Sequence, residues 1–137
     1  MSKQELQALF MEFQELNGMM QQLEKQQQLV SSQLIDLMIA KQNLEDLKDV
    51  KKGTPILVPI SSGVYAKAKI EETDQYIVNI GSNITVIKSV EQAQQMLEKQ
   101  AADVKEMQDA LEQEMQENTI KATMLEQRIQ KLASQKQ

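Results

Sequence analysis

Histidine, cysteine and tryptophan are absent from this sequence of 137 residues, and only 3% of its residues are aromatic. Without His and Cys, the chain lacks the usual general base at neutral pH, the reactive thiol and most ligands of transition metals. It also cannot form a disulfide framework. We therefore predict that the protein is not an enzyme and that it uses no catalytic residue, metal or other cofactor.

Basic charge and long apolar runs are also scarce. With 20 acidic and 15 basic residues, the net charge of -5 is unfavourable for binding a phosphate backbone. No stretch approaches the roughly 20 apolar residues of a membrane span, and the first residues, MSKQELQALF, do not resemble a signal peptide. We predict a single cytoplasmic chain, residues 1–137, that binds neither nucleic acid nor membrane.

Residues 2–52 contain one glycine and no proline, and apolar residues recur there in alternating steps of three and four. This heptad pattern predicts a coiled-coil helix. A helix of that length, about 75 Å at 1.5 Å per residue, exceeds the diameter of a compact domain, so we expect it to project. One seam position holds Leu6, Phe13, Met20, Gln27, Leu34 and Lys41, and the other holds Leu9, Leu16, Leu23, Val30, Leu37 and Leu44.

Residues 89–134 repeat this pattern and predict a second coiled-coil helix, with Ser89 as its N-cap. Steps of three, four and four from Val104 through Leu111 to Met115 predict a stutter there. The expected seam residues are Val90, Ala93, Leu97, Gln100, Val104, Met107, Leu111, Met115, Asn118, Ala122, Leu125, Ile129 and Leu132.

Between the helices, residues 53–88 hold both prolines, three of the four glycines and many β-branched residues. This composition predicts two successive β-hairpins, with strands near Ile56 to Ile60, Val64 to Glu71, Gln75 to Ile80 and Ile84 to Lys88. Strand alternation places apolar side chains together on strand faces. The candidate interface residues are Ile56, Val58, Ile60, Val64, Ala66, Ile70, Val78, Ile80, Ile84 and Val86.

The two helices are predicted to pair with each other in antiparallel orientation. One register pairs Leu6 with Leu132 and continues inward to Leu44 with Ala93, and no layer opposes two polar residues. A parallel dimer would instead place Lys41 against Lys41, which is unfavourable when buried. The predicted fold is therefore mainly α with a small β insert, a long antiparallel two-helix coiled coil joined by two β-hairpins.

The insert of 36 residues is shorter than the roughly 40 that a domain needs to remain folded without outside help. Its hairpins also have open edges and apolar faces, which other chains can pair with. We therefore expect the hairpins to form an assembly platform. The alternative is a monomeric helical hairpin with a decorated turn.

Apolar residues also lie off the seam toward the chain ends: Phe10, Met11, Met19, Ile120 and Met124. Methionine-rich surfaces suit binding to varied apolar partners. Long helices also carry exposed apolar residues without a function, and Leu29, Ile35, Met38 and Ile39 are off the seam nearer the hairpins. The pattern alone leaves both interpretations open.

The middle segment carries a specific resemblance. ILVPISSGVYAKAKI, Ile56 to Ile70, and YIVNIGSNITVIKSVEQA, Tyr76 to Ala93, are similar to the hairpin signatures of the prefoldin family. Ser61-Ser62 departs from the usual residues before Gly63. Two hairpins, rather than one, resemble the alpha class of this family.

This resemblance implies a hexamer of two alpha and four beta subunits, whose hairpins oligomerise into a β-barrel platform carrying six coiled coils. It further implies a co-chaperone, a holdase that prevents aggregation of unfolded client proteins and delivers them to a group II chaperonin without ATP. An archaeal source fits the family. The alternative is a structural coiled-coil scaffold or a filament-forming relative.

Taken with the resemblance, the chain ends are the expected client-binding tips. The last turns of a helix lack intrahelical partners, so they can fray and open the seam. The candidate tip residues are Leu6, Leu9, Phe10, Phe13, Leu125, Ile129 and Leu132.

Overall fold

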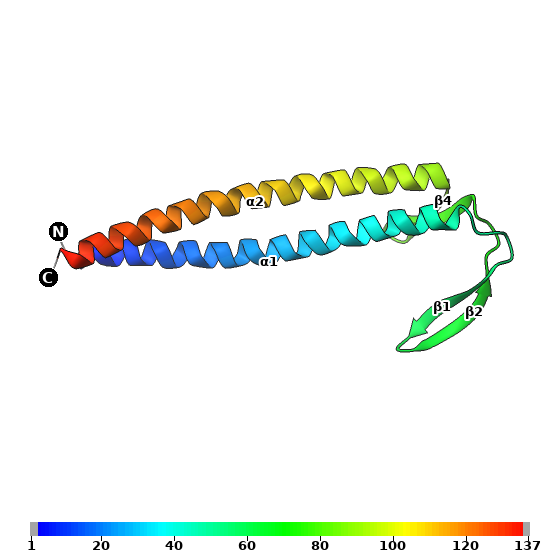
Figure 1. Cartoon of the computed structure of the whole chain (residues 1–137), viewed down its shortest axis with the longest axis horizontal. Helices are drawn as coiled ribbons and strands as arrows, with labels where there is room; N and C mark the ends of the chain where they lie inside the picture. The colour runs from blue at the N-terminus through cyan, green and yellow to red at the C-terminus, as the bar shows by residue number, and fades with distance from the viewer. Residues whose placement is uncertain (1–2, 136–137) are drawn as a thin grey trace. The chain divides into compact units, whose positions relative to one another are not determined.

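The computed structural model describes residues 3–135 and contains two helices and four strands in that range. The order is α1 (Lys3–Leu47), β1 (Pro55–Ser61), β2 (Val64–Lys69), β3 (Gln75–Gly81), β4 (Ile84–Ser89) and α2 (Val90–Ser134) (Figure 1). This confirms the predicted fold class. Ser2, the predicted first helical residue, lies outside the described residues.

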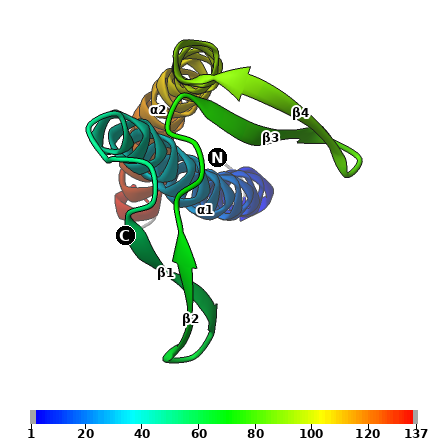
Figure 2. The same ribbon diagram turned by 90° about the vertical axis from the view of Figure 1, so that its right-hand side faces the viewer.

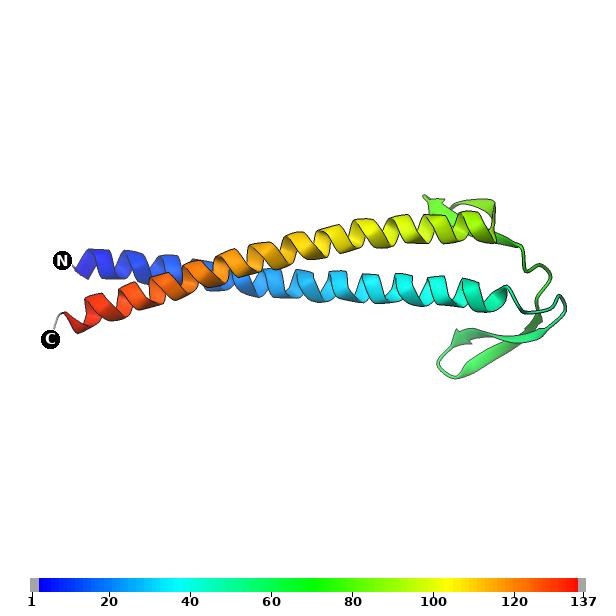
Figure 3. The ribbon, with the colours of Figure 1, turned by 45° about the horizontal axis from the view of Figure 1, so that its top comes forward.

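The chain divides into two compact units. The first, which we call the helical unit, comprises residues 1–34 and 104–137, and the second, the hairpin unit, comprises Ile35–Asp103. Within each unit α1 and α2 lie side by side in antiparallel orientation (Figures 1 and 3). The predicted pairing of the two helices of one chain is thus observed.

The core of the helical unit is the seam between the helices. Leu16, Leu23 and Val30 of α1 are buried there, as is Asn118 of α2. The remaining predicted α1 seam residues of this unit are half-buried. The heptad pattern therefore identified the buried side of α1 correctly, because its apolar stripe has no other surface to pack against.

The predicted seam of α2 is wrong at two positions. Gln100 and Met107 are exposed, whereas the neighbouring Ala101 and Gln108 are half-buried. The two successive four-residue steps therefore run from Ala93 to Ala101 near the start of α2, and not from Met107 to Met115 as predicted. Moving the stutter rotates the intervening turns of α2, which brings Ala101 and Gln108 to the half-buried side of the helix.

α1 ends at Leu47, earlier than the predicted end at Lys52. Past Leu44, the next two seam positions are Lys48 and Lys51, which offer no apolar side chain to bury. The chain turns there instead, and the Val50 amide donates to the Leu47 carbonyl at 3.2 Å.

The start of α2 is set by a capping box at Ser89, the predicted N-cap. The Gln92 amide donates to Ser89 Oγ at 3.2 Å, and the Ser89 amide donates to Gln92 Oε1 at 3.1 Å. Two backbone donors at the helix terminus are satisfied in this way.

The strands form two separate antiparallel hairpins, β1 with β2 and β3 with β4 (Figure 2). They lie close to the predicted positions, although β2 ends at Lys69 rather than Glu71. The β3–β4 turn places Ser82 and Asn83 at positive φ, the conformation of a type I′ turn that matches the twist of paired strands. The β1–β2 turn uses positive φ at Gly63.

Candidate functional site

Two sets of apolar residues form the candidate functional sites, one on the hairpins and one at the outer end of the helical unit. On the first hairpin, Ile56 pairs with Ala68 and Val58 pairs with Ala66, which places these side chains on one face as predicted. All residues of β1 are exposed, and Ile56 and Val58 are 37% and 42% exposed. Ala66 and Ala68 are half-buried, so among the described residues this apolar face is only partly covered.

The opposite face of the first hairpin is apolar in part. Leu57 pairs with Lys67, and Pro59 pairs with Tyr65. Leu57 and Tyr65 are both exposed. Neither Leu57 nor Tyr65 was among the predicted interface residues. Apolar residues on both faces of a strand nevertheless indicate that both faces become covered.

The inner face of the second hairpin packs toward the helices of its own unit. Val78 pairs with Val86, and both are half-buried. Val78 and Tyr76 line a groove of about 410 Å³ together with Leu44, Leu47 and Met96. The predicted face of this hairpin is therefore partly occupied by its own chain.

The outer face of the second hairpin was not predicted as an interface. Ile77 pairs with Ile87, and these side chains are 77% and 69% exposed. The sequence did indicate this outer face through the consecutive apolar residues Ile77-Val78 and Val86-Ile87, because they give each strand two apolar faces.

Other predicted hairpin residues lie next to the turns. Ile60 and Val64 flank the first turn, Ile80 and Ile84 flank the second, and all four are exposed. Ile70 follows β2, is half-buried, and its carbonyl accepts from the Gly53 amide at 2.7 Å. The structure thus brings the predicted residues together within each hairpin.

The predicted tip residues come together where the first turns of α1 lie beside the last turns of α2 (Figure 3). Six of them lie on the seam and are half-buried: Leu6, Leu9, Phe13, Leu125, Ile129 and Leu132. Phe10 is instead 51% exposed. The seam is less completely closed here than farther inward, where Leu16, Leu23 and Val30 are buried.

The exposed apolar residues near this end extend the candidate tip surface. Met11, Met19, Ile120 and Met124 are between 51% and 64% exposed. They lie on both helices, as the sequence indicated. The resulting surface is apolar and, through its methionines, deformable.

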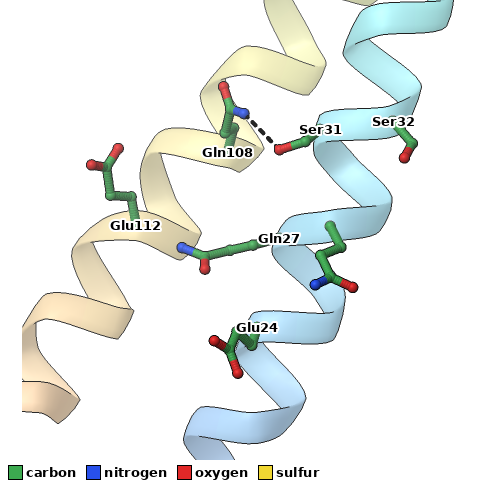
Figure 4. A pocket seen from close by; sticks show the side chains of 7 residues that line it. Glu24, Gln27, Ser31, Ser32, Gln108 and Glu112 are labelled. Carbon is green, nitrogen blue, oxygen red and sulfur yellow. Dashed lines mark hydrogen bonds between the residues drawn. The ribbon is translucent and has the colours of Figure 1, made fainter.

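Polar residues on the seam have partners in two layers. In the helical unit, the Gln108 side-chain amide donates to Ser31 Oγ at 3.1 Å, beside Gln27 (Figure 4). In the hairpin unit, the Lys41 ammonium lies 3.5 Å from the Glu98 carboxylate. These contacts explain how polar residues are accommodated at Gln108 and Lys41.

Among residues 3–135, no group of three His, Cys, Asp or Glu side chains is placed to hold a metal ion. Over the same residues, neither helix combines the length and the apolar character that crossing a membrane requires.

Comparison with known proteins agrees with the geometry of helices and hairpins. The family model "Prefoldin subunit" matches residues 16–135. The chain therefore belongs to the prefoldin family, which is a family of chaperones and not of enzymes.

Relatives support the predicted alpha class. The prefoldin subunit alpha of Thermofilum pendens is 31% identical over 96 residues, which cover 70% of this chain and 74% of the relative. The prefoldin subunit alpha of Pyrococcus horikoshii is 31% identical over 106 residues, covering 77% and 72%. The resemblance noted from the hairpin motifs is thus confirmed.

Solved structures share the fold. A filamentous PFD from Methanocaldococcus jannaschii matches with a TM-score of 0.73 and 23% identity over 82% of this chain and 93% of that chain. The prefoldin beta subunit from Thermococcus strain KS-1 matches with a TM-score of 0.62 and 15% identity, covering 93% and 91%.

Proposed function

We propose that this chain is a subunit of a holdase that assembles with beta-class subunits, two alpha and four beta, and binds unfolded client proteins. In this proposal the complex works without ATP in the cytoplasm, where chains emerge during synthesis, and passes its clients to a group II chaperonin. The observation that carries the client-binding role is the exposed apolar surface at Phe10, Met11 and Met124 beside a partly closed seam.

The proposed assembly uses the hairpins. An isolated two-stranded hairpin is marginally stable in water, so the uncovered apolar faces on both hairpins favour pairing with other subunits. The interface residues are those predicted from the sequence, together with Leu57, Tyr65, Ile77 and Ile87.

Light scattering tests the assembly. We expect a discrete complex of six chains when this chain is mixed with a beta-class subunit. A monomer unaffected by the subunit would contradict the platform, and growing filaments would favour the scaffold function, in which platform edges pair without closing a ring.

Client binding by the tips uses several weak contacts. Each apolar side chain that a client covers contributes on the order of 1 to 2 kcal/mol, so a single contact is weak. Simultaneous binding by the tips of several coiled coils raises the affinity for the client. Fraying of the last turns would add the seam residues Leu9, Phe13, Leu125 and Ile129 to the contact surface.

Phe10 separates client binding from helix stability. We expect Phe10→Ser to weaken capture of an unfolded client with little change in Tm, because Phe10 is already exposed. Leu9→Ser should lower both capture and Tm, because Leu9 lies on the seam. Gln14→Ser, at an exposed polar position of the same helix, is the control. Unchanged capture by Phe10→Ser would contradict this tip assignment.

A further inference from the structure

Asn118 is the one described residue that is polar, buried on the seam and without a partner. It is 6% exposed, and its Nδ2 atom makes no hydrogen bond. Burying an amide donor without an acceptor is unfavourable. The polar seam residues Gln108 and Lys41 both have partners, so Asn118 needs a separate explanation.

Setting the register does not explain Asn118. A seam Asn fixes register by pairing with a polar group across the seam. The predicted register places Met20 opposite Asn118, and a thioether is at most a weak acceptor. An apolar residue in this layer would therefore give a more stable coiled coil.

Asn118 lines a groove of about 530 Å³ on the helical unit, which we call the Asn118 groove. Its apolar lining consists of Leu16, Met19, Met124 and Leu125. The methionines are 51% and 64% exposed, and each has three rotatable bonds. A side-chain shift that lets an acceptor reach the buried Nδ2 is therefore feasible at this site.

The charges around the Asn118 groove balance each other. Glu12 and Glu15 lie on the α1 side, and Lys121 and Arg128 lie on the α2 side. Two carboxylates and two cations give no net attraction for a charged ligand. The groove therefore suits a neutral partner that is apolar along its length and carries a hydrogen-bond acceptor.

We propose that the Asn118 groove binds an extended apolar segment of an unfolded chain, with Asn118 Nδ2 donating a hydrogen bond to a main-chain carbonyl of that segment. An unfolded chain has main-chain carbonyls without intramolecular partners, whereas those of a folded protein are already paired. The groove would thus recognise the unfolded state through its main chain as well as its apolar side chains. This inference rests on the proposed function, which it extends inward from the helix ends.

The test compares two full-length variants assembled with a beta-class subunit. Asn118→Leu removes the donor and fills the layer with an apolar side chain, so it should raise Tm. Gly18→Ala should also raise Tm, because Gly18 lies inside α1 and an added Cβ meets nothing within 4 Å. Gly18→Ala therefore stiffens the same part of the helical unit and leaves Asn118 in place.

Binding of a short fluorescein-labelled peptide rich in Leu and Val is measured by anisotropy. We expect Asn118→Leu to raise Kd about threefold to tenfold, the range for loss of one hydrogen bond, and Gly18→Ala to leave Kd unchanged. Wild-type affinity in Asn118→Leu overturns the inference. Equal weakening in both variants also overturns it, because stiffness alone then explains the loss.

A second readout follows the hydrogen bond itself. The side-chain amide signal of Asn118 in an NMR spectrum is identified as the one missing from Asn118→Leu. We expect its proton resonance to move downfield when the peptide saturates the wild-type complex, and an unmoved resonance overturns the inference. If the wild-type complex binds no peptide at all, the proposed function itself fails.

Discussion

At the scale of single residues, polar side chains fix the ends of the helices and link them. Glu45, near the end of α1, accepts a hydrogen bond from the Gln94 side-chain amide at 2.8 Å and pairs with Lys48 at 3.2 Å. These groups lie at the surface, so they contribute more to the relative placement of the two helices in the hairpin unit than to stability.

The Glu45 carboxyl should titrate below its ordinary pKa of 4.5, because the hydrogen bond from Gln94 and then the contact with Lys48 favour its charged form. A pKa lowered by folding contributes stability above the unfolded value and loses it as pH falls through the folded value. NMR titration measures this, and Gln94→Ala should raise the pKa of Glu45. An unchanged pKa in that variant would show that the Gln94 contact is absent.

Ser89→Ala should lower the free energy of unfolding by about 1 kcal/mol, because it removes the oxygen that accepts from the Gln92 amide at the start of α2. Thermal denaturation followed by circular dichroism measures this. Ser134→Ala, near the exposed end of the same helix, is the control and should change stability less. Equal effects would contradict the role of Ser89 as the N-cap.

At the scale of elements, the sequence predicted the type of every helix and strand because the two periods, near 3.6 and 2, separate so clearly in this chain. It did not predict where α2 shifts its seam. The choice lay between Gln100 and Ala101 at one position and between Met107 and Gln108 at the other. Only the packing against α1 shows that Ala101 and Gln108 face inward. Likewise, Val78 and Ile77 are both apolar, so alternation could not show which one faces the helices.

The shifted seam predicts unequal effects of truncating two methionines of α2. Met107→Ala should change the free energy of unfolding by less than about 0.5 kcal/mol, because Met107 is 52% exposed. Met115→Ala should cost about 1 to 2 kcal/mol, because Met115 is half-buried on the seam. Urea denaturation measures both changes in the free energy of unfolding. A larger loss for Met107→Ala would support the seam predicted from the sequence.

The outer face of the second hairpin should contribute to assembly. Ile77→Asp should reduce the mass of the complex with a beta-class subunit, because it places a charge where an apolar pair is to be covered. Thr85→Asp, an exposed position on the same hairpin face, adds the same charge outside the isoleucine pair and should weaken assembly less. Full assembly of Ile77→Asp would remove this face from the proposed interface.

At the scale of the whole molecule, one chain carries two kinds of uncovered apolar surface. The hairpin unit exposes Ile77, Ile87 and Leu57, and the helical unit exposes Phe10 and Met124. The chain belongs to the prefoldin family, and under the proposed function the first surface binds other subunits and the second binds clients. The family motif in the sequence covered the hairpins, whereas the helix ends carried only general heptads, so the sequence specifies the proposed assembly surface more closely than the proposed client surface.

The most direct test of the holdase function is light scattering from a client protein that aggregates on heating, without ATP, in the presence of the complex with a beta-class subunit. We expect the complete complex to suppress the rise in scattering. A complex whose alpha chains begin at Gln14 and end at Met124, and whose beta chains are shortened correspondingly, should assemble but suppress it much less, because it lacks the tip residues and keeps only part of the client-binding surface. Undiminished aggregation with the complete complex would contradict the holdase function, and full suppression by the shortened complex would contradict client binding at the tips.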